Sequence, residues 1–330
     1  MTRTALITGV GGQDGSLLAE LLLEQGYDVF GVVRRDPGEY SNLGAIRSQV
    51  VFLDAHLLDA RSLSDALRTA KPQEVYNLAS VSFVPSSWDD PVKTAEHAAV
   101  GVTTLLEAIR AVDPAIRFYQ ASSSEIFGEP SVSPQDEATP LGPLTPYGVA
   151  KAYGHFITRS YRTRYGMHAS SGILYNHESP RRPEDFLPRK VSAAVARIAR
   201  GEQTELLLGD LSASRDWGYA GDYVRAMWLM LQEDDPADYV IATGVAHQVG
   251  ELVEVAFSHA GLNWRDHVRV DESLLRGRAE LHRLVGNSTQ ARERLGWEPS
   301  VSFEGLVRML VDADLAAGTA AGAGFGGDSA

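Results

Sequence analysis

The sequence predicts an α/β fold in which a doubly wound parallel sheet carries helices on both faces and a smaller C-terminal α/β lobe follows. Strand-like runs alternate with amphipathic helical stretches over the first half of the chain, and this rhythm breaks after residue 175. Such alternation is typical of parallel sheets, because each crossover between parallel strands needs a helix-length connection. We therefore expect 1–175 to form the sheet domain, with some later segments returning to it, and 176–315 to form mainly the second lobe.

The expected elements follow from apolar periodicity. The predicted strands are 4–8, 28–33, 50–53, 74–78, 116–121 and 169–174, and the predicted helices are 16–25, 61–70, 93–111 and 146–164. In the second half we expect a helix near 222–232, a strand at 239–242 and a terminal helix near 303–316. Residues 316–330 are rich in Gly and Ala with almost no apolar bulk, and we expect them to be disordered.

The composition is that of a cytosolic enzyme. The 330 residues include 43 acidic and 30 basic side chains, and the net charge of −13 argues against binding to nucleic acid or an anionic membrane. No run approaches the roughly 18 apolar residues of a membrane span. The chain has no cysteine, which excludes disulfides and thiolate chemistry. It enters the first strand without a signal-peptide pattern, so we expect a cytoplasmic location. We also expect no metal site.

A glycine-rich turn joins the first strand to the first helix. Gly9, Gly12 and Gly15 allow a tight turn, a close approach to a pyrophosphate and packing of the helix on the sheet. The helical pattern from Ser16 to Gln25 follows this turn, which includes Gln13 and Asp14, and the helix N-terminus favours phosphate charge. The turn predicts a Rossmann-type dinucleotide site.

The second strand ends in Arg34 and Arg35, where a site selective for NAD often carries an acidic residue at the ribose 2′-hydroxyl. Arginine suits a 2′-phosphate instead, so we expect NADP as the cofactor. The alternative is that the arginine pair only makes the strand end soluble.

A polar strand end, Ser122-Ser123-Ser124-Glu125, precedes Tyr147 and Lys151. The latter two are four residues apart and share one face of a predicted helix, where the lysine ammonium is expected to lower the pKa of the phenol. A Tyr–Lys pair at this spacing is usually structural. Behind a nucleotide-binding unit we interpret it as catalytic, with Tyr147 as a candidate base.

The most specific segment runs from Asn176 to Arg182 and reads Asn-His-Glu-Ser-Pro-Arg-Arg. Its amide, imidazole, carboxylate and paired guanidinium groups suit an anionic ligand with many hydroxyls. The alternative is a solvated charged loop.

These motifs resemble those of the extended short-chain dehydrogenase/reductases, and most closely those of the GDP-mannose 4,6-dehydratase family, from Thr4 to about Leu315. The matching segments are 8–9, 12–16, 32–35, 76–79, 118–122, 176–182, 215–218 and 222–232. Gln-Asp-Gly-Ser at 13–16 and the 176–182 segment are much more specific than the glycine fingerprint. Serine at position 124 favours the GDP-mannose branch, because the related dTDP-glucose dehydratases usually have aspartate there.

The resemblance implies conversion of GDP-mannose to GDP-4-keto-6-deoxymannose. Tyr147, supported by Lys151, would take the 4-hydroxyl proton while hydride leaves C4 for NADP, and Ser123 would polarise the 4-oxygen. Glu125 would then remove the C5 proton before water leaves C6, and the hydride would return to C6. The alternatives are a 4,6-dehydratase of another nucleotide-sugar, a 4-epimerase or 4-keto reductase with little need of a base at 125, and a non-catalytic NADP sensor.

The resemblance also assigns residues to the two ligands. The cofactor set is Gly9, Gly12, Gln13, Asp14, Gly15, Arg34, Arg35, His56, Leu57, Leu78, Ala79, Ser80, Ser82, Tyr147, Lys151, His177 and Arg182. The nucleotide-sugar set is Ser82, Asn176, Lys190, Arg215, Arg278 and Glu280. Cations such as Lys190 and Arg215 suit a diphosphate because they make charge-assisted hydrogen bonds.

The chain departs from the family pattern in four places. His56 stands where an aspartate is usual, Val81 replaces a glutamine, and Arg276-Gly277-Arg278-Ala279-Glu280 replaces a Tyr-Arg-Pro-x-Glu segment. The loop after Arg35 is also shorter. The resemblance implies a homodimer in which helices 93–111 and 146–164 pair across the interface, and the short loop makes a tetramer less favoured.

Overall fold

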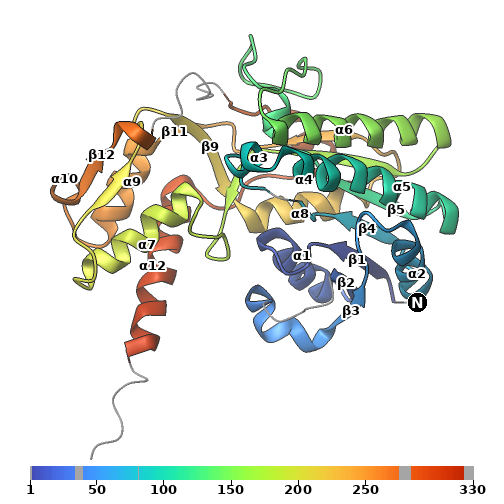
Figure 1. Ribbon diagram of the computed structural model, residues 1–330, viewed down its shortest axis with the longest axis horizontal. Helices are drawn as coiled ribbons and strands as arrows, with labels where there is room; N and C mark the ends of the chain where they lie inside the picture. The colour runs from blue at the N-terminus through green and yellow to red at the C-terminus, as the bar shows by residue number, and fades with distance from the viewer. Residues whose placement is uncertain (1, 34–39, 81, 275–283, 323–330) are drawn as a thin grey trace, which may run out of the picture.

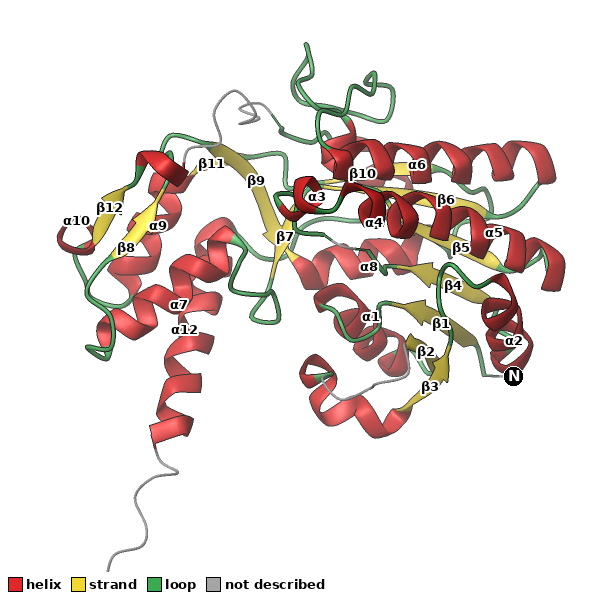
Figure 2. Ribbon diagram, in the orientation of Figure 1, coloured by secondary structure: helices red, strands yellow, loops and turns green. Residues whose placement is uncertain are grey.

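The computed structural model describes residues 2–33, 40–80, 82–274 and 284–322. Its main body is a seven-stranded sheet in which every pairing is parallel, with strand order β3-β2-β1-β4-β5-β6-β10 (Figures 1 and 2). The strands are β1 (Thr4–Thr8), β2 (Asp28–Val33), β3 (Val50–Asp54), β4 (Glu74–Asn77), β5 (Arg117–Ala121), β6 (Ala169–Leu174) and β10 (Asp238–Ile241). The predicted doubly wound α/β fold is confirmed, and the strand order reverses between β1 and β4.

Helices cover both faces of this sheet. On one face α1 (Gln13–Glu24) packs beside α8 (Ala220–Met230) around Leu18 and Tyr223, and on the other α2 (Ala60–Ala70), α5 (Gly101–Val112) and α6 (Pro146–Tyr165) enclose Leu67 and Leu105. All six residues of β6 are consequently buried. Burial on both faces explains why strands such as β1 and β2 do not alternate between apolar and polar residues.

Local signals set the ends of α6. The Thr145 hydroxyl accepts from the Gly148 amide at 3.0 Å, Pro146 occupies the first helical position, and Gly166 ends the helix with a φ of +65°. A side-chain cap, an N-terminal proline and a left-handed glycine are the usual helix boundaries. This cap places Tyr147 in the first turn and Lys151 one turn later.

The helix expected at 93–111 is not continuous. Helix α4 (Pro91–Ala95) passes through a π-helical turn, η2 (Glu96–Val100), into α5. In this turn Ala98 and Ala99 pack against Ala150 of α6, and a Cβ on Gly154 would lie 3.1 Å from the Ala98 carbonyl oxygen. The wide turn adjusts the backbone to this close helix contact, which apolar periodicity does not reveal.

The smaller lobe follows β6 and lies beside the sheet domain (Figures 1 and 2). Its core contains Trp217 and Phe257. Its elements are β7 (Asn176–Glu178), α7 (Leu187–Ala199), β8 (Leu206–Leu208), β9 (Ser214–Tyr219), β11 (Ala246–Gln248), α9 (Val249–His259), α10 (Trp264–His267), β12 (Val268–Val270) and α12 (Phe303–Gly322). Besides α8 and β10, α11 (Thr289–Leu295) packs on the sheet domain. The short elements are η1 (Ser41–Gln49), α3 (Ser86–Asp89), η3 (Ser124–Ile126) and η4 (Glu272–Leu274).

The terminal helix is longer than the sequence predicts. Helix α12 continues to Gly322, so 316–322 are helical and the expectation of disorder is wrong there. Alanine has the highest helix propensity, and four of these seven residues are alanine. The rest of the tail lies outside the described residues. Within the described ranges, no helix is both long and apolar enough to span a bilayer.

Candidate active site

A cavity of about 600 Å³ opens at the carboxyl ends of β1, β4, β5 and β6, where the sheet domain faces the smaller lobe. Open α/β sheets bind ligands at this edge, where the strand order reverses. Most of the residues assigned from the sequence line it: Gly9, Gly12, Gln13, Asp14, Gly15, Leu78, Ala79, Ser80, Ser82, Ser123, Glu125, Tyr147, Lys151, Asn176, His177, Arg182, Lys190 and Arg215. The fold thus brings together three sequence motifs that are far apart in the chain.

The glycine-rich turn has no room for side chains. Gly9 has a φ of +73°, and a Cβ there would lie 2.9 Å from the Ala79 amide nitrogen. A Cβ on Gly15 would lie 2.2 Å from the Gly9 carbonyl oxygen. The turn therefore brings its backbone and the first turn of α1 directly to the cavity, an arrangement that fits the pyrophosphate of a dinucleotide.

His177 and Asp14 form a charged pair beneath this turn. The His177 Nδ1 lies 2.7 Å from the Tyr175 carbonyl oxygen and its Nε2 lies 2.9 Å from an Asp14 carboxylate oxygen. Both partners accept, so both ring nitrogens carry protons and the ring is an imidazolium. Its ring stacks on that of Tyr223 with centroids 4.7 Å apart.

The pKa values agree with this charge state. Burial opposes both charges, yet the attraction between them outweighs it. For Asp14, burial raises the pKa, but the neighbouring His177 and then Arg182 lower it to about 2. For His177, burial lowers the pKa, but Asp14 raises it above the usual value.

The 176–182 segment is tied to α1 by further hydrogen bonds. The Gln13 amide donates to the His177 carbonyl at 3.1 Å and accepts from the Ser179 hydroxyl at 2.9 Å. Arg181 pairs with Glu20 at 2.6 Å, so the first arginine of the pair is structural. The guanidinium of Arg182 instead lies 3.6 Å from the ring centroid of Phe186 and lines the cavity.

The expected catalytic side chains converge on one wall of the cavity. Ser123 is the N-cap residue of η3, Glu125 is half-buried within η3, and Tyr147 and Lys151 project from α6. The Lys151 ammonium lies 5.6 Å from the centre of the Tyr147 ring and donates to the Ala121 carbonyl at 3.0 Å. The helical spacing therefore places the pair together as predicted.

The expected lowering of the Tyr147 pKa is wrong for this structure. Burial raises the pKa of Tyr147 to about 12, although a hydrogen bond with Ser123 lowers it in part. Burial likewise lowers the pKa of Lys151 to about 8. Desolvation of the phenol outweighs the hydrogen bond with Ser123 and the charge of Arg182, because a buried phenolate loses its hydration.

The lobe supplies further lining residues. Lys190 on α7 donates to the Leu207 carbonyl at 2.9 Å, and Arg215 on β9 donates to the Ser214 carbonyl at 2.8 Å. Both side chains reach the cavity, and Asn176 reaches it from β7. The lobe thus adds cationic and amide groups to the cavity lining.

Several assigned residues are not placed at the cavity. Leu57 is buried in the core beside Gly101, and His56 accepts from the Leu58 amide and stands edge-on to His97, 5.7 Å between centroids. Neither lines the cavity. Arg34, Arg35, Arg278 and Glu280 lie outside the described residues, as do Val81 and Arg276.

The sequence patterns also missed lining residues. Glu178 is buried and lines the cavity. It lies between His177 and Arg182, which were both assigned from the sequence, so its place in this segment could have identified it. Phe186 packs edge-on to Phe83 with centroids 5.4 Å apart, and Trp217 comes from β9. These aromatic residues carry no motif, and only the fold brings them to the cavity.

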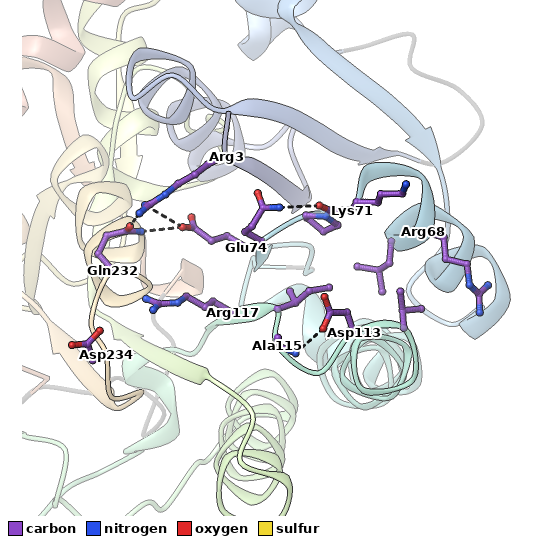
Figure 3. A pocket seen from close by; sticks show the side chains of 14 residues that line it. Arg3, Arg68, Lys71, Glu74, Asp113, Ala115, Arg117, Gln232 and Asp234 are labelled. Atoms are coloured by element: carbon purple, nitrogen blue, oxygen red, sulfur yellow. Dashed lines mark hydrogen bonds and ion pairs between the residues drawn. The ribbon is translucent and has the colours of Figure 1, made fainter. Parts of the chain in front are cut away.

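A second cavity, of about 900 Å³, lies at the amino-terminal edge of the sheet (Figure 3). There Arg3, Gln232 and the buried Glu74 point toward one another, and Arg117 donates to the Leu231 and Glu233 carbonyls. The positively charged side chains of this cavity offset the negative charge of Glu74 and the partial negative charge at the C-terminal ends of α2 and α5. These contacts are structural, and the carboxyl-edge cavity is the candidate active site. No cluster suited to a metal ion occurs in the described part of the chain.

A parallel sheet with a glycine-rich first turn, a Ser–Tyr–Lys set and a second lobe over the same edge defines an extended short-chain dehydrogenase/reductase. Comparison with known structures supports this class. The chain is similar to UDP-glucose 4-epimerase of Thermus thermophilus in complex with NAD, with a TM-score of 0.82 and 27% identity over 94% of this chain and 98% of that one.

Sequence comparison gives the particular family. The family model described as GDP-mannose 4,6 dehydratase matches residues 6–310. GDP-mannose 4,6 dehydratase 1 of Arabidopsis thaliana is 48% identical over 95% of this chain and 90% of its own length. The human GDP-mannose 4,6 dehydratase is 43% identical over 94% and 91%. The chain belongs to the GDP-mannose 4,6-dehydratase family, as its motifs predicted.

Proposed function

We propose that the protein converts GDP-mannose to GDP-4-keto-6-deoxymannose by internal oxidation, loss of water and reduction, with NADP as its resident cofactor. The observation that carries this proposal is the convergence of Ser123, Glu125, Tyr147 and Lys151 on one wall of a cavity that begins at the glycine-rich turn. Family membership supports the same substrate.

The four side chains have distinct roles in this proposal. Tyr147 removes the proton from the sugar 4-hydroxyl, and Ser123 holds the 4-oxygen. Burial keeps the phenol protonated, with a pKa of about 12, and the hydrogen bond with Ser123 opposes this effect. We assign stabilisation of the phenolate to Ser123 and to the Lys151 ammonium, which lies 5.6 Å from the centre of the Tyr147 ring. The 4-ketone acidifies C5, so Glu125 removes the C5 proton while the C6 hydroxyl takes up a proton and leaves as water, which gives a C5–C6 double bond. NADP, held at the glycine-rich turn, would supply the hydride acceptor for C4 and the hydride donor for C6, and a proton would return to C5.

The cavity fits a dinucleotide, since the contacts at Gly9 and Gly15 exclude side chains along its floor. The preference for NADP rests on Arg34 and Arg35 of the sequence. We expect NADP to bind more tightly than NAD, and Arg34→Ala to reduce that preference. Equal or tighter binding of NAD in fluorescence titration of the cofactor-stripped protein would overturn this assignment.

Lys190 and Arg215 are suited to the diphosphate of the nucleotide-sugar, and Asn176 to its sugar hydroxyls. Arg278 and Glu280 remain predicted contacts of the nucleotide. The reaction is tested by incubating the purified protein with GDP-mannose, UDP-glucose and dTDP-glucose separately. Mass spectrometry should show loss of water from GDP-mannose, with a 4-keto-6-deoxy product; an absolute preference for dTDP-glucose would contradict the proposal.

A 4-epimerase is the second candidate, because the protein resembles one in structure. Glu125 discriminates between the two reactions. In D₂O, the dehydratase should incorporate solvent deuterium at C5, and Glu125→Gln should retain nucleotide-sugar binding but slow this exchange by about 10²–10⁴-fold. Unchanged exchange would place the base elsewhere.

We also propose that the protein is a cytoplasmic homodimer. Exposed apolar side chains lie along α4, η2 and the outer face of α6: Val92, Val100, Val149, Tyr153 and Phe156. An apolar helical face of this kind suits pairing with the same face of a second copy. Light scattering that shows only monomer would contradict the assembly.

A further inference from the structure

A chain of buried polar side chains crosses the sheet toward the active site. Thr8 ends β1, Asn77 ends β4 and Gln120 lies near the end of β5. They are neighbours in register across the three strands. All three are at least 97% buried, which is unusual for polar side chains unless they are hydrogen-bonded.

The hydrogen bonds that link these three side chains can run in only one direction. The Thr8 hydroxyl oxygen accepts from the Leu78 and Ala79 amides, each at 3.1 Å, which occupies both of its lone pairs. Its proton must then go to the Asn77 side-chain oxygen, 2.7 Å away. This contact fixes which end of the Asn77 amide is oxygen.

The same logic continues to the next strand. The Asn77 nitrogen donates to the Gln120 side-chain oxygen at 2.8 Å, so the Gln120 nitrogen is directed onward and donates to the Ala121 carbonyl at 3.0 Å. Lys151 donates to this same carbonyl oxygen, also at 3.0 Å. The amide of Gln120 and the ammonium of Lys151 therefore share one acceptor and are no more than about 6 Å apart.

We propose that Gln120, oriented by Asn77 and Thr8, is a positioning residue that holds the Ala121 carbonyl in place for the Lys151 ammonium. Consecutive bonds that all point the same way polarise one another and strengthen the last donor, which is the Gln120 side-chain N–H. Helix α6 also packs closely over the amide, since a Cβ on Gly154 would lie 3.7 Å from the Gln120 nitrogen. The proposal rests on the proposed function in one respect only, the catalytic role of Lys151.

Two variants test it. Gln120→Met has a similar volume but no amide, and we expect kcat for GDP-mannose to fall about tenfold while KM changes less than twofold. Gln120→Glu retains the acceptor for Asn77 and places a carboxylate beside the ammonium. Opposite charges about 6 Å apart in a protein interior change a pKa by about one to two pH units, so the pKa of Lys151 should rise by at least one pH unit.

The Lys151 titration can be measured without catalysis. The chain has only four lysines, Lys71, Lys93, Lys151 and Lys190, so the ¹³C-labelled lysine side chains give few NMR signals, and Lys151→Arg identifies the one required. Ser171→Ala is the matched control, because Ser171 is buried and faces Gln120 in register on β6 but lies outside the chain of hydrogen bonds. It should leave both kcat and the titration unchanged.

An unshifted Lys151 titration in folded Gln120→Glu, or an unchanged kcat in Gln120→Met, would overturn the positioning role. A wild-type protein inactive on GDP-mannose whose Lys151 pKa still rises in Gln120→Glu would instead overturn the proposed function and leave the hydrogen-bonded chain intact.

Discussion

Replacing Asp14 by asparagine tests the ion pair beneath the glycine-rich turn. The structure holds the pKa of Asp14 at about 2 instead of 3.8, and a difference of one pH unit in pKa corresponds to about 1.4 kcal/mol, so the charged carboxylate contributes roughly 2 kcal/mol to the free energy of unfolding. Its side chain is only 20% exposed, which limits screening by solvent. Asp14→Asn should therefore lower the stability by about this amount near pH 6.

The pH dependence follows from both partners. The lowered pKa of Asp14 gives stability that is present above pH 3.8 and is lost as the pH falls toward about 2. The raised pKa of His177 gives stability that is complete below about 6.5 and is lost as the pH rises through the higher value in the folded protein. The difference between wild type and Asp14→Asn should therefore be largest between about pH 4 and 6.5 and should shrink above it.

Urea denaturation at pH 6 and pH 9 measures this difference, provided that the variants have equal m values. Asp28→Asn is the control, because Asp28 is an exposed aspartate at the start of β2. A stability difference of the same size at both pH values, or one no larger than that of Asp28→Asn, would refute the ion-pair account.

Three other predictions follow from the geometry. Gly15→Ala should abolish cofactor binding in fluorescence titration, because its Cβ would lie 2.2 Å from a carbonyl oxygen, whereas Gly250→Ala, with its nearest neighbour at 3.4 Å, should bind normally. Tyr147→Phe should reduce turnover at least about 10²-fold in a product assay with unchanged nucleotide-sugar affinity, and a smaller loss would exclude it as the base. Phe156→Asp should give monomers in light scattering, while Leu207→Asp, an exposed change on the lobe, should not; equal behaviour would exclude the α6 interface.

Much of the sheet domain was predictable because its signals are local. Each predicted strand from 4–8 to 169–174 corresponds to an observed strand within one residue at either end. The strands β1, β2 and β3 are mainly apolar, and Thr145 and Pro146 mark the start of α6 as a side-chain cap and an N-terminal proline. The helix at 93–111 was wrong in detail, since the π-helical turn responds to contact with α6 rather than to its own sequence.

The candidate site likewise combines residues that the sequence indicated with residues that only the fold brings to the cavity. The residue types at 9–15, 122–125, 147–151 and 176–182 indicated a dinucleotide, a base and an anionic ligand with many hydroxyls, and the family resemblance specified that ligand as a nucleotide-sugar. The aromatic lining at Phe83, Phe186 and Trp217 had no comparable signal, because apolar side chains at a cavity and in a core look alike in a sequence.

The order of residues along the chain was enough to predict most of the elements and the family to which the chain belongs, and it indicated the side chains to which we assign the chemistry. The charge states and orientations of those side chains were set by the folded arrangement alone. Asp14 and His177 are 163 positions apart in the sequence, and they form an ion pair only because β7 packs against α1 in the folded protein. Tyr147 stays a phenol and Gln120 is directed at Ala121 for the same reason. Burial and hydrogen bonding depend on every neighbour in space, and most of those neighbours are remote in the chain.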